Sequence, residues 1–177
     1  MHKEELTGSR TIYEGKIITL KACTVRLENG AEVLRELVEH PGGVGILALD
    51  EEENVLLVRQ YRFGAGQVLL ELPAGKLEPG EDPAQCGMRE LEEETGCCAA
   101  SFAPLGRIHP TPAYVSEVIH IFLARGLTHK RQSLDADEFL TVEKVPLRQA
   151  VQLCLDGGIT DAKTVFALLK YNALQKQ

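Results

Sequence analysis

The sequence predicts an α/β protein with a mixed sheet, one central helix and a strand-rich N-terminal extension. Three observations predict this class. Short apolar runs bounded by turn residues recur from residue 11 to residue 72, as they do in strands. One helical segment with recognisable caps follows at residues 83–95, and apolar runs then resume. Two further helical segments, at residues 147–155 and 161–174, close the chain.

The first forty residues form the N-terminal extension. Its expected strands are residues 11–13, 16–26 and 31–39. Glu28-Asn29-Gly30 is a hairpin turn signal, and His40-Pro41-Gly42-Gly43 interrupts the strand pattern. A chain of 177 residues fits one main domain with a small appended part. We therefore divide it into an N-terminal β subdomain, residues 1–40, and a main domain, residues 41–177.

The main domain alternates apolar runs with turns. Its expected strands are residues 44–50, 55–61, 68–72, 102–108, 118–124 and 139–145. Turn residues at 51–54 and 64–66 separate the first three of these strands, and a polar stretch at 128–137 precedes the last. The run at 44–50 indicates a buried strand, because nearly all of its residues are apolar.

The central helix has the clearest boundaries. Asp82 is a favourable N-cap, Pro83 suits the first helical position, and Gly96 is the usual residue after a helix C-terminus. The helix is therefore expected over residues 83–95. The stripe that we expect to pack on the sheet consists of Ala84, Met88, Leu91 and Thr95. Gly87 lowers helix stability by about 1 kcal/mol, and close packing against the sheet would explain its presence.

The composition limits the classes of partner. Hydrophobic residues make up 44% of the chain and charged residues 25%, as in folded soluble proteins. A net charge of −7 argues against nucleic acid as the main partner, because polyanion binding needs a basic face. The first eleven residues are polar and unlike a signal peptide, and no apolar run is long enough to span a membrane. Five cysteines without zinc-site spacing indicate reduced thiols, so we expect a cytoplasmic protein without a membrane partner.

Glutamates cluster on the central helix. Glu90 and Glu94 are four residues apart and share a face, and Glu93 lies three residues after Glu90. Such a cluster is unfavourable unless cations neutralise it, and oxygen ligands suit Mg²⁺ or Mn²⁺. Glu81 can join from the preceding loop, and Arg89 can orient Glu93 through an ion pair. The alternative is a solvated acidic helix face with an ordinary surface ion pair.

The segment around this helix resembles the Nudix box, written G-x5-E-x7-R-E-U-x-E-E-x-G-U with U apolar. The matching residues are Gly75, Glu81, Arg89, Glu90, Leu91, Glu93, Glu94 and Gly96. Cys97 stands at the last apolar position, where it acts as a small hydrophobic residue. On ordinary residue usage, the seven invariant letters recur by chance at roughly 10⁻⁹ to 10⁻⁸ per starting position.

The resemblance implies a Nudix-type α/β/α sandwich and a pyrophosphohydrolase. In such enzymes a metal-activated water attacks one phosphorus of a diphosphate. The implied metal ligands are Glu90, Glu93 and Glu94, with Glu81 in support and the backbone carbonyl of Ala74 as a further ligand. The implied cofactor is Mg²⁺, with Mn²⁺ as the alternative.

The segments on either side of the box look like the ADP-ribose pyrophosphatase branch. They are Val58-Arg59-Gln60-Tyr61-Arg62, Glu71-Leu72-Pro73-Ala74-Gly75, the later residues Pro110, Pro112 and Glu117, and the stretch at 156–164. This likeness implies a small nucleoside diphosphate substrate, ADP-ribose or a related sugar nucleotide. The products would be AMP, or another nucleoside monophosphate, and a sugar phosphate. Another sugar nucleotide, or an oxidised nucleoside triphosphate, is the alternative substrate.

Several residues outside the box are candidates for substrate binding. Arg62 is placed near the nucleotide, because a guanidinium stacks on adenine or pairs with phosphate; the alternative is a strand-end arginine paired with Glu71. The branch resemblance adds Pro112 and Glu117, and it implies a homodimer formed through the N-terminal strands. Arg35 and Glu36 would then contribute to the neighbouring subunit's pocket.

The general base is expected outside the box. Related enzymes carry it as a glutamate on a loop before a late strand, where this chain has Asp135, Asp137 and Glu138. Glu138 is our choice, because glutamate has the longer reach. The alternatives are a solvent-facing Glu138 and a base within the box, Glu93.

The sequence argues against two other functional classes. A non-catalytic Nudix domain that senses a nucleotide would usually show a decayed box or an appended domain, and the sequence shows neither. A cysteine hydrolase built on Cys86 is disfavoured, because neighbouring acidic residues raise the pKa of a thiol.

Overall fold

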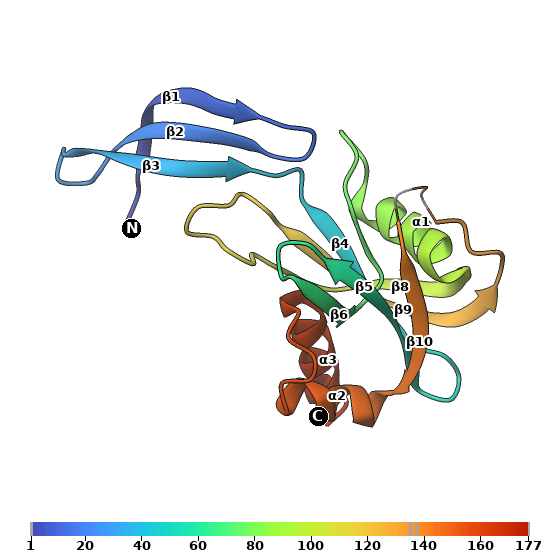
Figure 1. Cartoon of the computed structure of the whole chain (residues 1–177). Coiled ribbons are helices and arrows are strands. Elements are labelled where there is room, and N and C mark those ends of the chain that lie inside the picture. The colour runs from blue at the N-terminus through green and yellow to red at the C-terminus, as the bar shows by residue number, and fades with distance from the viewer. Residues whose placement is uncertain (1, 135, 137, 177) are drawn as a thin grey trace. The chain divides into compact units, whose positions relative to one another are not determined.

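Figure 1 shows the protein as a computed structural model that describes residues 2–134, 136 and 138–176. Two compact units are distinguished by their internal contacts. The first contains the residues through Gly42 together with residues 109–118, and the second contains residues 43–108 and the chain from residue 119 onward. The segment 109–118 therefore belongs with the N-terminal unit, although it lies far from it in sequence.

The N-terminal unit is built on an antiparallel sheet in the order β1-β2-β3. Its strands are β1 (Glu5–Glu14), β2 (Thr19–Arg26) and β3 (Glu32–Glu39). β1 begins six residues earlier than the sequence pattern predicts, because Glu5 pairs with Arg26 at the far end of β2. Residues 109–118 join this unit through a parallel bridge between Val38 and Val115.

The described residues of the second unit form two sheets. Its strands are β4 (Gly43–Ala48), β5 (Asn54–Arg62), β6 (Gln67–Glu71), β7 (Ala74–Lys76), β8 (Cys97–Ile108), β9 (Ile119–His129) and β10 (Leu140–Pro146). One sheet has the order β7-β4-β9-β8 and the other β10-β5-β6. β4 and β9 run parallel while their other neighbours run antiparallel, so the expected mixed sheet is confirmed.

In the described part of this unit, three helices cover the sheets. They are α1 (Pro83–Thr95), α2 (Leu147–Leu155) and α3 (Ala162–Leu174). Alternate residues of β4 enter two separate cores: Ile46 packs with Leu91 of α1, and Leu47 packs with Leu168 of α3. α1 and the α2–α3 pair therefore cover opposite faces of the strand layer, which confirms the expected α/β/α sandwich (Figure 1). Among the described residues, no helix has the length and apolar character needed to cross a membrane.

The helix boundaries agree closely with the sequence prediction. Asp82 accepts hydrogen bonds from the backbone N–H groups of Ala84 and Gln85 at 3.0 and 3.1 Å, and Gly96 ends α1 in the left-handed conformation. A Cβ added at Gly87 would lie 2.8 Å from the Phe102 ring. The close packing expected at this mid-helix glycine is therefore present.

Three details differ from the sequence prediction. β7 was not expected, because three residues are too few to give a periodic pattern. β8 and β9 are longer than the expected strands at 102–108 and 118–124. Their pairing runs from Cys97 opposite His129 to Ile108 opposite Ile119 and so includes small and polar residues. The apolar stripe on α1 was partly wrong: Met88 is exposed, and the buried residues are Cys86, Gly87, Leu91 and Glu94.

Candidate active site

The loop between β7 and α1, together with α1 itself, brings four glutamates of the predicted site together. Glu81 lies on the loop and accepts a hydrogen bond from the backbone N–H of Glu78 at 3.0 Å. Glu90, Glu93 and Glu94 follow on α1. The N-cap at Asp82 and the C-terminal Gly96 fix the start and end of the helix, and so fix which face carries these carboxylates.

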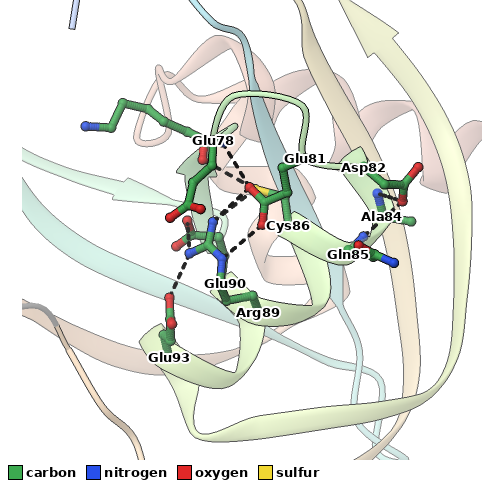
Figure 2. Close-up of polar contacts among 10 residues, drawn as sticks. Glu78, Glu81, Asp82, Ala84, Gln85, Cys86, Arg89, Glu90 and Glu93 are labelled. Atoms are coloured by element: carbon green, nitrogen blue, oxygen red, sulfur yellow. Dashed lines mark hydrogen bonds and ion pairs between the residues drawn. The ribbon is translucent and has the colours of Figure 1, made fainter. Parts of the chain in front are cut away.

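Arg89 contacts three of the four carboxylates (Figure 2). Its Nε and Nη2 donate to the two oxygens of Glu81 at 3.1 and 3.2 Å. Its Nη1 donates to Glu90 at 2.8 Å and to Glu93 at 2.9 Å. These contacts lower the pKa of Glu81 to about 2, through the Arg89 hydrogen bond first, and raise the pKa of Arg89. The predicted Arg89–Glu93 ion pair is present, and Glu81 does turn toward the helix.

Gly75 makes room for the Glu90 carboxylate. β7 holds Gly75 beside Val44 of β4, and the Glu90 side chain lies directly against it. A Cβ at this position would overlap the carboxylate of Glu90. The first glycine of the box is therefore required by a close approach, rather than by an unusual backbone angle.

Gly75→Ala is expected to displace Glu90 and to lower the hydrolytic activity proposed below by about a hundredfold, while the protein still folds. A hundredfold loss corresponds to a shift of reacting groups by about 1 Å. Steady-state kinetics and circular dichroism would test this. The matched control is Gly64→Ala, because a Cβ at Gly64 meets no atom within 4 Å. Full activity in Gly75→Ala would contradict the assignment of Glu90 to the site.

Glu94 is the most buried carboxylate of the cluster. Only 1% of its surface is exposed, and one of its oxygens accepts a hydrogen bond from the backbone N–H of Ala74 at 2.9 Å. Burial raises the pKa of Glu94 to about 8, and the negative charges of Glu138 and Glu90 add to this effect. Burial also raises the pKa of Glu90. This part of the site therefore disfavours further negative charge and favours a cation.

Glu138 lies close enough to the cluster to affect it. It precedes β10 and is half-buried, and its charge contributes to the raised pKa values of both Glu90 and Glu94. The other two candidates for the general base, Asp135 and Asp137, lie outside the described residues.

The donor set fits a hard divalent cation. Carboxylate oxygens are the ligands that Mg²⁺ and Mn²⁺ prefer, and the pKa values of Glu90 and Glu94 are raised by burial first and by neighbouring carboxylates second. The carboxylates of Glu81, Glu90 and Glu93 converge on Arg89 instead. Accordingly, within residues 2–134, 136 and 138–176 no three His, Cys, Asp or Glu side chains surround one cation position.

Arg62 is paired with Glu71, as one of the two sequence interpretations proposed. Its Nε and Nη2 donate to the two oxygens of Glu71 at 2.8 and 2.9 Å. A third member of this group, Lys163 of α3, was not predicted from the sequence; it forms ion pairs with Glu71 and Asp161. No local pattern marks a lysine in the first turn of a helix as the partner of a strand residue 92 positions away.

Four of the candidate substrate residues lie in the N-terminal unit. Arg35 forms an ion pair with Glu4 at 2.7 Å, and Glu36 is exposed on β3. Pro112 is exposed, and Glu117 lies 3.4 Å from the Nδ1 atom of His40. The ion pairs of Arg35 and Glu117 join residues of that unit, and the roles of all four residues in substrate binding stay predictions.

The arrangement on α1 agrees with a known family. A family model described as "NUDIX domain" matches residues 39–168. The chain belongs to the NUDIX domain family. The matched stretch contains the whole Nudix box and both flanking segments, from β3 to the middle of α3.

Curated relatives of this Nudix chain match over nearly its full length. It is 38% identical over 168 residues to the ADP-ribose pyrophosphatase of Bacillus subtilis (strain 168), a match that covers 94% of this chain and 91% of that protein. It is 37% identical over 178 residues to the methanol dehydrogenase activator of Bacillus methanolicus, covering 99% and 96% of the two chains.

A solved structure supports the same fold. The crystal structure of an ADP compounds hydrolase matches the Nudix chain with a TM-score of 0.86, covering 98% of this chain and 95% of that one at 24% identity. Together these findings confirm the predicted family, the Nudix fold and the class of Nudix hydrolase.

A cysteine nucleophile is disfavoured at the Nudix box. Burial raises the pKa of the Cys86 thiol to about 12, and hydrogen bonding to Glu81 adds to this effect. The thiol donates to the carbonyl oxygen of Lys76 at 3.4 Å. A thiol that stays protonated at neutral pH is a poor nucleophile.

Proposed function

We propose that this Nudix chain is a divalent-cation-dependent pyrophosphohydrolase. Its substrate would be ADP-ribose or a related nucleoside diphosphate sugar, and its products AMP, or another nucleoside monophosphate, and a sugar phosphate. The observation that carries the proposal is the convergence of Glu81, Glu90 and Glu93 on Arg89, with Glu94 buried beside them inside an intact Nudix box. The relative named ADP-ribose pyrophosphatase supports the choice of substrate.

The box residues would hold Mg²⁺, or Mn²⁺ in its place. Glu90, Glu93 and Glu94 are the proposed ligands, with Glu81 and the carbonyl oxygen of Ala74 in support. When bound, the cation would neutralise the diphosphate and lower the pKa of a bound water.

The chain's other residues have separate roles in the proposal. Arg89 orients the Glu81, Glu90 and Glu93 carboxylates through the hydrogen bonds described above. Arg62 binds the anionic substrate, and Glu138 accepts the proton of the attacking water. Support for Glu138 comes from its half-buried position and from its electrostatic effect on Glu90 and Glu94.

Glu138→Gln is expected to lower kcat by about 10²–10⁴, the usual contribution of a general base. The matched control is Glu143→Gln on β10, because Glu143 forms an ion pair with Arg59 of β5 and has no assigned role in the site. Activity over a range of pH would be measured for both variants. A decrease in kcat of less than about tenfold in Glu138→Gln would contradict the assignment of Glu138 as the general base, and Glu93 would be the next candidate.

A hydrolysis panel with Mg²⁺ tests the proposed substrate. ADP-ribose, other sugar nucleotides, dinucleotides and nucleoside triphosphates would be compared by kcat/KM. A preference for ADP-ribose or another nucleoside diphosphate sugar is expected. Preference for triphosphates would overturn the substrate assignment alone. Nucleotide binding without turnover of any compound would overturn the proposed enzymatic activity and favour a nucleotide-sensing domain.

A homodimer formed through the N-terminal strands is part of the proposal. Nine of the ten residues of β1 are exposed, and exposed apolar side chains include Leu6, Ile12, Tyr13 and Leu34. A sheet that leaves such residues uncovered has the character of an interface rather than of a free surface. The cytoplasmic location likewise stays a prediction from the reduced cysteines.

A further inference from the structure

Arg62, Glu71, Lys163 and Asp161 form a charged group beside the Nudix box. The Arg62 guanidinium lies with two of its nitrogens on Glu71, and the Lys163 ammonium contacts both Glu71 and Asp161. The Glu71 side chain is 2% exposed and that of Lys163 is 9% exposed, whereas Arg62 keeps 39% of its side chain accessible. The charges of Glu71 and Lys163 are therefore buried, whereas the Arg62 guanidinium that Glu71 binds is partly exposed.

Lys163 comes from a different layer of the fold. It lies in the first turn of α3, and its aliphatic part passes Gly45 of β4, where an added Cβ would lie 3.6 Å from Lys163 Cδ. The hydroxyl of Thr164, the next residue on α3, accepts a hydrogen bond from the backbone N–H of Leu72 at 2.9 Å. This contact anchors the start of α3 to the segment that follows β6.

The same segment leads directly to the buried carboxylate of the box. Ala74, whose N–H donates to Glu94, lies only three positions after Glu71. Three residues span at most about 10 Å, so the Arg62–Glu71 pair lies near Glu94. The charge of Glu94 also contributes to the raised pKa of Arg62, after the Glu71 hydrogen bond.

Burying two ion pairs is costly, and apolar residues of similar volume often replace them without loss of stability. Arg62 alone already satisfies both oxygens of Glu71. Lys163 is therefore not needed to complete the hydrogen bonding of Glu71 to Arg62, and its presence has another effect. It keeps Glu71 ionised despite its burial, since the charge of Lys163 lowers the pKa of Glu71 alongside Arg62. An ionised, immobile Glu71 fixes the guanidinium plane and leaves Nη1 free of side-chain partners within the described part of the chain.

We infer that Glu71 and Lys163 are positioning residues that hold Arg62 for binding the substrate's diphosphate. Neither residue touches the substrate in this assignment; each acts through Arg62. The inference rests on the proposed function, because it takes a nucleoside diphosphate as the ligand. A fixed guanidinium forms directed hydrogen bonds to phosphate oxygens with little loss of side-chain entropy.

Lys163→Met tests the inference, because methionine keeps the length and apolar stem of the side chain and removes its charge. The KM of this variant for ADP-ribose is expected to rise about tenfold, because one charge-assisted hydrogen bond to the substrate would be weakened. Its kcat should stay within about threefold of wild type. Lys163→Arg should restore most of the loss. The structural control is Ala167→Gly, one turn later on α3 and fully buried. It should lower Tm without changing KM.

A double-mutant cycle with Arg62→Met separates positioning from folding. Since Lys163 is assigned to act through Arg62, the double variant should have the KM of Arg62→Met alone. Additive effects, or an unchanged KM in Lys163→Met, would overturn the inference. Calorimetric titration with ADP-ribose distinguishes failure of the inference from failure of the proposed function. A protein that binds ADP-ribose without hydrolysing it would contradict the proposed function. The double-mutant cycle, measured as Kd for ADP-ribose, would still decide the positioning role. Absence of binding would overturn both.

Discussion

Glu90→Gln and Glu94→Gln, made one at a time, are each expected to lower kcat/KM for diphosphate hydrolysis by on the order of 10³-fold. A cation at a phosphoryl centre contributes several kcal/mol of transition-state stabilisation, and each 1.36 kcal/mol is a factor of ten. Each substitution removes one proposed anionic ligand of the cation while keeping the side-chain size. The fold should persist in Glu94→Gln, because the amide oxygen can still accept the hydrogen bond from Ala74.

Glu92→Gln is the matched control for these variants. Glu92 lies on the same helix between the box glutamates, but its carboxylate contacts Lys130 and Cys98. Surface pairs of this kind contribute little, so activity should stay within about twofold of wild type. Steady-state kinetics and Tm on all three proteins would separate catalysis from stability. Near-normal activity in Glu94→Gln, or an equal loss in Glu92→Gln, would remove the basis for a metal site on this face of α1.

Removal of divalent cations is expected to abolish hydrolysis and to make the protein's stability depend on pH. The pKa of Glu94 is about 8 in the folded chain, against an ordinary value of 4.5, mainly because the group is buried. Between pH 4.5 and pH 8, Glu94 is therefore protonated in the folded state and ionised in the unfolded state. Stability of the metal-free protein should therefore be highest at the acidic end of this range and fall as pH rises toward 8.

Mg²⁺ should counteract this loss. The cation competes with the proton on Glu94, so the increase in Tm on adding Mg²⁺ should be larger at pH 8 than at pH 6. Differential scanning calorimetry in chelator and in excess Mg²⁺ would measure both trends. Glu94→Gln should flatten the metal-free profile, since an amide does not titrate. A metal-free stability that rises steadily from pH 5 to pH 8 would contradict the assigned environment of Glu94.

Local signals predicted the box and the helices well. The capping residues Asp82 and Gly96 give the two ends of α1, and the spacing of Glu90, Glu93 and Glu94 places their side chains together because the helical period is fixed. The bounds of α2 were also predicted correctly. Such features depend on neighbours within a few residues, so the sequence alone carries them.

Features that depend on distant pairing were harder to predict. β7 exists because three residues pair with β4, and β1 extends because its polar residues find partners on β2. The segment 109–118 joins the N-terminal unit through Val115, although no local pattern indicates this. Lys163 was missed for the same reason: its partner Glu71 is brought near by the packing of α3 on the strands.

Phosphorus-31 NMR of ADP-ribose incubated with the protein and Mg²⁺ tests the central claim most directly. The proposed cleavage replaces the two diphosphate resonances with two phosphomonoester resonances of equal intensity, one of AMP and one of the sugar phosphate. Glu92→Gln should give the same spectrum, and Glu94→Gln should leave the diphosphate intact over the same time. Unchanged diphosphate resonances in the wild-type reaction, under conditions where calorimetry records binding of ADP-ribose, would contradict the account.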